Sequence, residues 1–488
     1  EIQVLDDSTD ETRALVRRKV DSLRERGLDV AYIHRVHRAG YKAGALDHGL
    51  SSAKGELIAI FDADFLPQPE FLRAVVPHFV TDRRVGMVQA RWGHLNRDQS
   101  MLTRTQALML DGHHLVENRA RAAAGWLFNF SGTGGVWRKA AIADAGGWQH
   151  DTLTEDLDLS YRAQLAGWRF VYREDVVTPA ELPDEISAFR AQQFRWAKGT
   201  VQTARKLLAR LMRAELSTMQ RVEAFFHLTP HFAYPLMVFL SVLLLPALVM
   251  MPATDPKTML LIDLPLVIGT SGSLAAFYSM AERAQGRAAR EALKQLPALL
   301  ALGAGLAPHL SKAVWEGMRS MAGEFVRTPK KGLSSGSPAL DAASGSPAPT
   351  TATATTSRTR STTWARYRAG ADLPLVEMAL CLVSTASTLA SIRTGHWFAT
   401  PFAMLFTFGY GYVAVFVTVE ELARRRARHL ELAREGRSGS VGAARARARA
   451  MAIAAAATSD PDGGAHAVAD AVPDAAPRPL GGDLAASS

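Results

Sequence analysis

The stretch Leu57-Ile58-Ala59-Ile60-Phe61-Asp62-Ala63-Asp64 places two aspartates directly after a short apolar run. An apolar run of this length, followed by polar residues, predicts a buried strand. In open α/β sheets, ligands bind beyond the carboxyl ends of the strands, so Asp62 and Asp64 stand where a ligand is expected. Carboxylates at this spacing can reach a hard divalent cation that bridges the oxygens of a diphosphate. The alternative is an acidic helix start before Pro67.

The region around this stretch alternates short apolar runs with helical periods, which predicts an α/β layered domain over residues 1–215. The other strand candidates are Ile2–Leu5, Val30–Arg35 and Val85–Ala90. A second acidic pair, Asp6 and Asp7, follows the first of them. The chain begins at Glu1, inside an expected strand and without a methionine, so we expect a leading strand, and any membrane helix before it, to lie upstream.

Composition excludes several classes of protein. The chain has 488 residues, of which 48% are hydrophobic and 21% charged, and a net charge of +9. The single cysteine, Cys381, excludes an intrachain disulfide and a cysteine-based zinc site. The basic residues are scattered and form no recognition module, so we expect no nucleic-acid partner.

Four apolar runs are long enough to cross a bilayer, which needs about 20 residues. They are Ala224–Thr254, Thr258–Met280, Leu373–Ile392 and His396–Thr418. The second and third each hold one acid, Asp263 and Glu377, close to one end. We expect these carboxylates to reach the membrane interface; the alternative is a polar contact that faces a channel.

A fifth apolar segment, Leu296–Leu310, has only 15 residues and contains Gly and Pro. Lysines and arginines flank it on both sides, and the positive-inside rule places both flanks in the cytoplasm. An interfacial helix satisfies this pattern, whereas a span does not. The same rule predicts that Pro252–Lys257 and Arg393–Gly395 lie outside, with the α/β domain and the tail in the cytoplasm. The lipid bilayer is therefore an expected partner.

The remaining segments are of low complexity. Ser, Thr, Ala, Pro and Gly dominate Gly332–Thr363, and the tail beyond Arg424 is rich in Arg and Ala. We therefore divide the chain into an α/β domain (1–215), two spans (224–280), an interfacial helix with the loop after it (281–331), a linker (332–371), two spans (372–419), and a basic tail that we expect to be disordered (420–488).

Two further motifs carry chemistry. Thr154-Glu155-Asp156 opens a helical pattern, where Asp156 can act as a general base toward a hydroxyl group. Acids at this position also favour a helix N-terminus, and this remains the alternative. Gln192, Arg195 and Trp196 lie in a helical stretch before the first apolar run.

The aromatic ring in this second motif can stack on a sugar, and the guanidinium can hold diphosphate oxygens. The alternative is an interfacial Trp with a snorkelling Arg.

The ordered set is more specific than its parts. It runs Asp6-Asp7-Ser8, Gly40-Tyr41-Lys42-Ala43-Gly44-Ala45-Leu46, Asp62-Ala63-Asp64, Phe130-Ser131-Gly132-Thr133-Gly134-Gly135, Thr154-Glu155-Asp156, Gln192-Gln193-Phe194-Arg195-Trp196, and then the spans. This order resembles the membrane-embedded family 2 glycosyltransferases, the cellulose synthase superfamily with its D, DxD, TED and QxxRW motifs. Residues 2–196 resemble most the cellulose synthase-like A class of glucomannan 4-beta-mannosyltransferases.

The resemblance implies a GT-A nucleotide-sugar domain followed by an α-helical transmembrane region. It implies that the donor contacts Asp6, Asp7, Lys42, Asp62, Asp64, Arg195 and Thr328, with Mg²⁺ or Mn²⁺ at Asp62 and Asp64. It assigns the catalytic base to Asp156, and the acceptor contacts to Gly132, Thr133, Glu155, Gln192 and Trp196. Phe325–Lys330 resembles the gating loop of the family, although Arg327 stands where its best-known members carry valine. A basic juxtamembrane turn is the alternative for this loop.

The function implied is that of an inverting, metal-dependent hexosyltransferase that elongates a β-1,4-linked mannan, glucomannan or glucan from GDP-mannose or UDP-glucose. Processive synthesis with translocation across the membrane is part of this expectation. Transfer of one sugar to a membrane lipid and an inactive membrane scaffold remain alternatives. The expected membrane is the inner membrane of a bacterium or the Golgi membrane of a plant. The sequence indicates no oligomeric state or accessory subunit.

Overall fold

The computed structural model describes residues 1–251, 255–321, 323, 328 and 374–458. The linker predicted at residues 332–371 lies outside the described residues, as does the end of the tail from residue 459. The chain divides into two units after Ala423. The first contains the α/β domain and all the contacts discussed below.

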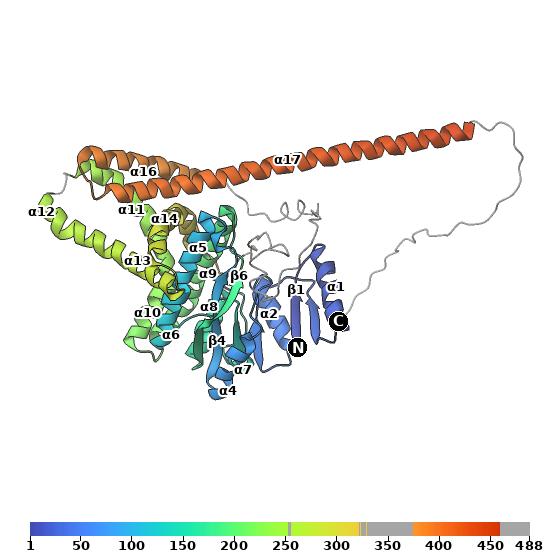
Figure 1. Ribbon diagram of the computed structural model, residues 1–488, viewed down its shortest axis with the longest axis horizontal. Coiled ribbons are helices and arrows are strands. Elements are labelled where there is room, and N and C mark those ends of the chain that lie inside the picture. Colours follow the sequence, from blue (N-terminus) through green and yellow to red (C-terminus); the bar gives the residue numbers. More distant parts are fainter. Residues whose placement is uncertain (252–254, 322, 324–327, 329–373, 459–488) are drawn as a thin grey trace, which may run out of the picture. The chain divides into compact units, whose positions relative to one another are not determined.

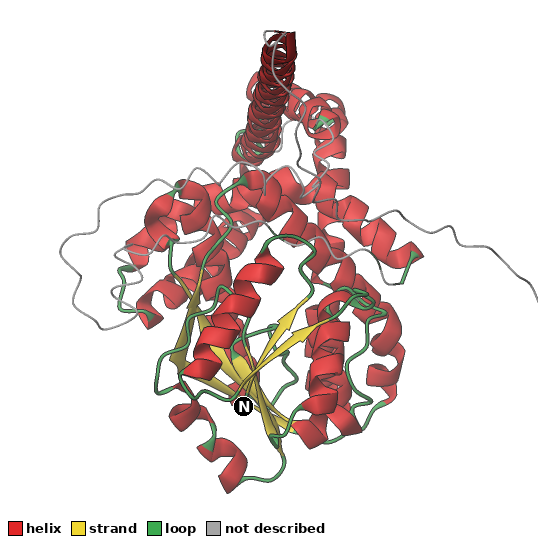
Figure 2. Cartoon of the chain, turned by 90° about the vertical axis from the view of Figure 1, so that its right-hand side faces the viewer, coloured by secondary structure: helices red, strands yellow, loops and turns green. Residues whose placement is uncertain are grey.

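The α/β domain has two sheets. Strands β1 (Ile2–Asp6) and β2 (Val30–His34) pair in parallel. A four-stranded mixed sheet has the order β3 (Leu57–Ile60), β5 (Gly135–Arg138), β4 (Val85–His94) and β6 (Arg169–Ala180). Strand β5 is antiparallel to both of its neighbours, whereas β4 and β6 are parallel. Figure 2 shows the strands in the middle of the domain, between helices.

All four strands expected from the sequence are present, but β5 and β6 were not among the candidates. Strand β5 has only four residues and begins with a glycine, so it gives almost no alternating pattern. In β6 the run Arg173-Glu174-Asp175 interrupts the apolar alternation. The interruption coincides with a shift of register against β4, between Ala90 and Arg91.

Helices cover both sheets. They are α1 (Thr12–Glu25), α2 (Tyr41–Ser52), α3 (Phe71–Val75), α4 (Pro77–Thr81), η1 (Arg97–Gln99), α5 (Met101–Gly112), η2 (His113–Asn118), α6 (Arg119–Ala123), α7 (Lys139–Asp144), α8 (Glu155–Leu165), α9 (Ile186–Arg213) and α10 (Thr218–Leu228). The main core packs the sheet residues Met87 and Trp137 against Ile142 of α7 and Leu159 of α8. Burial of this apolar surface fixes α8, and with it the motif at its start.

The C-terminal helices are η3 (Pro230–Phe232), α11 (Ala233–Met250), α12 (Pro256–Thr258), η4 (Met259–Asp263), α13 (Leu264–Ala284), α14 (Ala289–Arg319), α16 (Leu375–Thr394) and α17 (Thr400–Thr458). Figure 1 shows α11, α13, α14 and α16 together on one side of the α/β domain. Within the described residues, four helical segments are long and apolar enough to cross a membrane, as the sequence predicts: Pro230–Met250, Leu260–Ala284, Leu375–Thr394 and Thr400–Ala427.

The segment expected to be a 15-residue interfacial helix is part of α14, which has 31 residues and contains Pro297 and Pro308. It does not have the composition of a span. Its apolar residues are buried against protein, because Leu302 and Leu306 pack with Phe189 of α9 and Val413 of α17. The apolar run therefore reflects packing between helices.

The beginning of the expected disordered tail is helical in the structure, because α17 continues to Thr458. Alanine and arginine dominate this part of the chain, and both have high helix propensity. The expectation of disorder rested on the small apolar area available for burial, which does not include this propensity.

Candidate active site

Three separate motifs meet at the end of β3. The amide of Asp62 donates a hydrogen bond to Thr133 Oγ1 at 2.8 Å. Lys42, in the first turn of α2, reaches across with Nζ 2.6 Å from Asp62 Oδ1 and 2.9 Å from the carbonyl oxygen of Gly132. Lys42 therefore links the carboxylate of Asp62 to the glycine-rich loop before β5. Asp64, two residues after Asp62, is half-buried.

Asp156 lies beside this junction, in the first turn of α8. Its Oδ1 accepts the amide hydrogen of Leu157 at 2.8 Å. Gly132 has φ +82, and a Cβ at this position would lie 2.9 Å from Asp156 Oδ2 and 3.6 Å from Lys42 Nζ. Any side chain at position 132 would therefore fill the space in front of the carboxylate, and it would also be strained in this left-handed conformation.

The environment keeps the proton on Asp156 more firmly than water does. Burial, together with the neighbouring Glu155 carboxylate, raises the pKa of Asp156 to about 7, against the opposing effects of the Leu157 amide and Lys42. Burial also raises the pKa of Glu155, although Lys42 and Arg195 oppose this. A carboxylate with a pKa near 7 is matched to general base catalysis near neutral pH.

Two cations balance the carboxylates of the site. Burial lowers the pKa of Lys42, but Asp62, Glu155 and Asp156 together outweigh burial and raise it. Burial lowers the pKa of Arg195, and the same three carboxylates oppose that shift. Arg195 of α9 therefore lies within electrostatic reach of the same carboxylates as Lys42 of α2. The close contact of Gly199 with Thr154 brings α9 itself against the TED residues.

The three predicted residues of α9 share one face, because positions 192, 195 and 196 are three and four residues apart. Trp196 packs against the buried cluster of Ala107, Leu110 and Leu182. Its ring therefore packs against protein side chains, which disfavours the alternative of a tryptophan anchored in lipid. Gln192 is half-buried.

Helix α9 directly contacts the segment 153–156 at the start of α8, which we call the TED loop. It does so through residues that were not predicted from the sequence. A Cβ at Gly199 would lie 2.6 Å from Thr154 Cγ2 and 2.7 Å from the Thr154 nitrogen. The amide of Leu153 donates to Gln202 Oε1 at 3.0 Å, and the hydroxyl groups of Thr154 and Thr203 are 3.1 Å apart. The available signal was a glycine and polar residues in the middle of a helix, three to seven residues after Trp196.

Thr133, which is predicted to contact the acceptor, is held by two side chains to which the sequence assigned no role. Gln89 Nε2 and Trp92 Nε1 donate to the carbonyl oxygen of Thr133 at 3.1 and 3.3 Å. Gln89 Oε1 also accepts the amide hydrogen of Ser131 at 2.9 Å. Both side chains come from β4, so the central strand fixes the shape of the glycine-rich loop.

Asp6 and Asp7, at the end of β1, bind other residues of the α/β domain through their carboxylates. The two carboxylate oxygens of Asp6 accept hydrogen bonds from the Ser8 amide and the Tyr32 hydroxyl, at 2.9 and 2.8 Å. Burial raises the pKa of Asp6, but these hydrogen bonds prevail and lower it. Arg35 binds Asp7 with both Nε and Nη2, at 3.0 and 2.5 Å.

Arg35 also donates to the carbonyl oxygen of Tyr41, the residue before Lys42, at 2.9 Å. It thereby links the first acidic pair to the lysine of the site. The predicted contacts of Asp6 and Asp7 with a base and ribose stay predictions.

Asp62 and Asp64 fit a divalent cation whose remaining coordination positions are filled by a bound ligand. Within the described residues, no group of three or more His, Cys, Asp or Glu side chains is arranged to hold a metal ion. Mg²⁺ is commonly held by one or two protein carboxylates together with substrate phosphate oxygens. Asp62 and Asp64 are oxygen donors of this kind, and the carboxylate of Asp62 is 42% exposed, even though Lys42 contacts one oxygen.

The gating-type loop is mostly outside the described residues. Only Thr328 of the segment 325–330 is described; its hydroxyl is buried, and it has no hydrogen-bond partner in the described part of the chain. The predicted contact of Thr328 with the donor stays a prediction.

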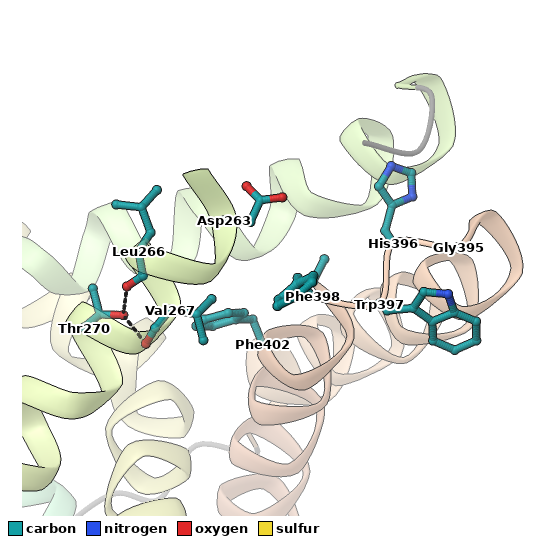
Figure 3. A pocket seen from close by; sticks show the side chains of 10 residues that line it. Asp263, Leu266, Val267, Thr270, Gly395, His396, Trp397, Phe398 and Phe402 are labelled. Carbon is teal, nitrogen blue, oxygen red and sulfur yellow. Dashed lines mark hydrogen bonds between the residues drawn. The ribbon is translucent and has the colours of Figure 1, made fainter. Parts of the chain in front are cut away.

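The two acids inside the apolar runs differ in their surroundings. Glu377 of α16 is buried and pairs with Arg190 of α9 at 2.8 Å, so its carboxylate has a protein cation as partner. The expectation that it reaches the membrane interface stays a prediction. Asp263 lies beside a separate cavity of about 480 Å³ between α13 and the loop that joins α16 to α17. Figure 3 shows the side chains of Val267, Phe398 and Phe402 among those that line this cavity.

Comparison with known proteins gives the following matches. The family described as "Glycosyltransferase like family 2" matches residues 2–199. A protein named glucomannan 4-beta-mannosyltransferase 1, from Oryza sativa subsp. japonica, is 40% identical over 259 residues, which are 51% of this chain and 50% of the relative. Glucomannan 4-beta-mannosyltransferase 2 of Arabidopsis thaliana is 44% identical over 216 residues, 43% of this chain and 40% of the relative. The chain thus spans about half the length of the curated relatives it matches.

Two solved structures also match. A mannosyltransferase from Pyrobaculum calidifontis, in complex with GDP-Man and Mn²⁺, is 23% identical with a TM-score of 0.39; the match covers 58% of this chain and 76% of that one. TarS of S. aureus, in complex with UDP-GlcNAc, is 16% identical with a TM-score of 0.33; the match covers 65% of this chain and 80% of that one.

Proposed function

We propose, on the premise that residues 2–199 are a family 2 glycosyltransferase domain, that this chain is a membrane-bound hexosyltransferase that elongates a β-1,4-linked glycan from a nucleotide sugar. The family match and the glucomannan 4-beta-mannosyltransferase relatives confirm the resemblance drawn from the motifs. The observation that carries the proposal is the convergence of Lys42, Asp62, Asp156 and Arg195, which come from four separate parts of the chain, around one space.

The donor is held through its diphosphate. Lys42 and Arg195 offer positive charge to the diphosphate oxygens, and they would exchange part of their pairing with the site carboxylates for contacts with these oxygens. A divalent cation, which Asp62 and Asp64 would hold, supplies further neutralisation of the leaving group. The identity of this cation, Mg²⁺ or Mn²⁺, is part of the proposal.

The transfer is a direct displacement with inversion. The acceptor hydroxyl gives its proton to Asp156, its oxygen forms a bond to the anomeric carbon, and the bond from that carbon to the diphosphate breaks. The nucleoside diphosphate leaves with the bonding electrons. Gly132 leaves space for the acceptor in front of Asp156, and we assign Gln192 and Trp196 to the terminal acceptor sugar.

The product proposed is a mannan or glucomannan, made from GDP-mannose or UDP-glucose. The names of the relatives support mannosyl transfer in β-1,4 linkage. Four helices that are long and apolar enough to cross a membrane follow the domain, which supports synthesis coupled to translocation of the growing polymer. We propose that the domain lies on the cytoplasmic side.

The test is incubation of the full-length protein in membranes with radiolabelled GDP-mannose or UDP-glucose, in the presence of Mg²⁺ or Mn²⁺. The product is then digested with β-1,4-mannanase and β-1,4-glucanase. Label in a polymer that the matching enzyme cleaves is the expected result. Label only in the lipid extract would make the protein a glycolipid synthase, and absence of nucleotide release with every donor would support an inactive scaffold.

A further inference from the structure

Two carboxylates from the C-terminal helices hold the start of α9. Glu420 of α17 accepts hydrogen bonds from the amides of Ile186 and Ser187, at 2.8 and 3.0 Å, and from Ser187 Oγ at 2.5 Å. These amides belong to the first turn of α9, which has no partner for them inside the helix. A carboxylate from a distant helix therefore caps α9, while the side chain of its own N-cap residue, Glu185, makes no capping bond.

The second contact is an ion pair one turn further along the same helix. Arg190 Nη2 lies 2.8 Å from Glu377 Oε1 of α16, and the two side chains are only 12% and 5% exposed. Burial lowers the pKa of Arg190, and both Glu377 and Glu420 oppose this shift. Two helices that qualify as membrane spans thus meet one short segment of α9 through charged, buried groups.

Such contacts fix position as well as favouring folding. A carboxylate at a helix N-terminus is favoured by the helix dipole and by hydrogen bonds to amides that have no other partner. A buried ion pair discriminates strongly against displacement, because separating the partners leaves an uncompensated charge. Sliding α9 along its axis by one residue, about 1.5 Å, would break both contacts together.

The held segment lies on the helix that carries the QxxRW residues. Arg195 is eight residues after Ser187, about 12 Å along the same helix. Further along, Gly199 packs on Thr154, and Lys198 pairs with Glu316 of α14 at 2.9 Å. Helix α9 is therefore held at its start by α16 and α17, and in its middle by the TED loop and α14.

We propose that Glu420 and Glu377 are positioning residues, which set where Gln192 and Trp196, the residues assigned to the acceptor sugar, stand relative to Asp156 and so govern how the acceptor is held during transfer. This inference rests on the proposed transferase function for its catalytic consequence. The contacts themselves, and their effect on α9, do not depend on that function.

The experiment compares full-length protein carrying Glu420→Gln, Glu377→Gln or the charge exchange Arg190→Glu/Glu377→Arg with the wild type in liposomes. Asp263→Asn is the matched control, because it also removes an acid near the end of a membrane helix but lies beside the cavity of Figure 3. Glu420→Asp is the conservative variant. Folding of every variant is checked by thermal unfolding.

The first readout is hydrogen exchange of the segment 186–196. Glu420→Gln should accelerate exchange there by about tenfold, the scale expected for loss of a charge-assisted cap. Exchange in α8 and in the sheet should be unchanged, and the control should show no effect. Unchanged exchange at 186–196 in both single variants would show that Glu420 and Glu377 do not hold α9, whatever the protein catalyses.

The second readout separates acceptor handling from donor chemistry. Lys42 on α2 and the DxD carboxylates hold the donor without α9, so release of nucleotide from GDP-mannose without acceptor should fall much less than transfer does. The KM for a β-1,4-mannan oligosaccharide should rise by about tenfold. The charge exchange should restore a large part of the loss seen in Glu377→Gln, and Glu420→Asp should restore part of the loss in Glu420→Gln.

Two outcomes are decisive for this second readout. An equal fall of nucleotide release and sugar transfer, in step with lowered thermal stability, would show a general structural role and overturn the positioning role. A wild type that transfers no sugar from any donor would instead refute the proposed function, and the exchange readout would still decide whether Glu420 and Glu377 hold α9.

Discussion

At the scale of single residues, Asp156 is the side chain on which the proposed chemistry depends. Its carboxylate faces the space that Gly132 leaves open, and its amide partner Leu157 leaves Oδ2 available on that side. No other carboxylate of the site combines this exposure toward the glycine-rich loop with a pKa raised to about 7.

We expect Asp156→Asn to lower sugar transfer by about 10²- to 10⁴-fold, which is the usual contribution of a general base. The KM for the donor should change little, because Lys42 and Arg195 remain. Transfer from radiolabelled donor measures the effect, and Asp98→Asn, which removes an exposed acid, is the control. Full activity of Asp156→Asn would assign the base to another residue.

The raised pKa of Asp156 predicts two pH dependences. Turnover should rise with pH and level off above about 7, because only the ionised carboxylate accepts a proton. The folded state favours the protonated carboxyl, so this contribution to stability is fully present below the unfolded pKa of about 4 and is lost as pH rises through 7.

The stability of Asp156→Asn relative to the wild type should therefore increase between pH 4 and pH 8. Thermal unfolding in detergent at both pH values measures this change. A pH-independent difference between the two proteins would show that the pKa of Asp156 is not raised in the folded state.

The sequence predicts candidate chemical residues but not the residues that orient them. Asp62, Asp156 and Arg195 belong to short motifs whose order along the chain is specific. Gln89 and Arg35 gave no such signal, because each acts by a hydrogen bond or ion pair to a residue far away in sequence. Only the fold brings such pairs together.

At the scale of elements, α9 connects the site with the rest of the chain. Its packing on the TED loop depends on Gly199, where a methyl group would lie 2.6 Å from Thr154 Cγ2 and 2.7 Å from the Thr154 nitrogen. One of these neighbours is backbone, so α9 and the start of α8 would have to move apart.

We therefore expect Gly199→Ala to lower sugar transfer by at least about tenfold, because small displacements of catalytic groups have large effects on rate. Gly303→Ala in α14 is the matched control, since a Cβ there meets no atom within 4 Å. It should leave activity unchanged and raise helix propensity slightly. Equal activity of the two variants in membranes would contradict the proposed role of α9 in placing the TED loop.

The elements themselves were predictable where their periodicity was strong. Strands β1 to β4 and the four apolar helices are confirmed, because each contains a run of mostly apolar residues. Strands β5 and β6 were not predicted, since a glycine and a charged run obscure them. The sequence does not show that α9 and α17 cover the apolar part of α14. The position of this helix at the membrane interface stays a prediction.

At the scale of the whole molecule, three acids of the C-terminal helices join these helices to the α/β domain. Glu282, at the end of α13, pairs with Arg97, which also binds Asp111. Glu377 near the start of α16 and Glu420 of α17 bind the start of α9. The three acids therefore mark one side of the helical region, the side that faces the α/β domain.

This arrangement predicts the topology. In a Cys381→Ala background, cysteines at Lys257 and Arg393 should react with a membrane-impermeant maleimide from the side opposite to a cysteine at the exposed Arg73. Labelling of intact and opened membrane vesicles distinguishes the two sides. Labelling of all three positions from one side would contradict a crossing by the four helices.

The central claim is that the chain transfers hexose from a nucleotide sugar into a β-1,4-linked polymer. The most direct measurement is the digestion of the radiolabelled product of full-length protein in membranes, with Asp156→Asn measured in parallel. We predict polymer that a β-1,4-mannanase or β-1,4-glucanase degrades, and none from the variant. Label found only in lipid, or polymer formed equally well by the variant, would contradict the account.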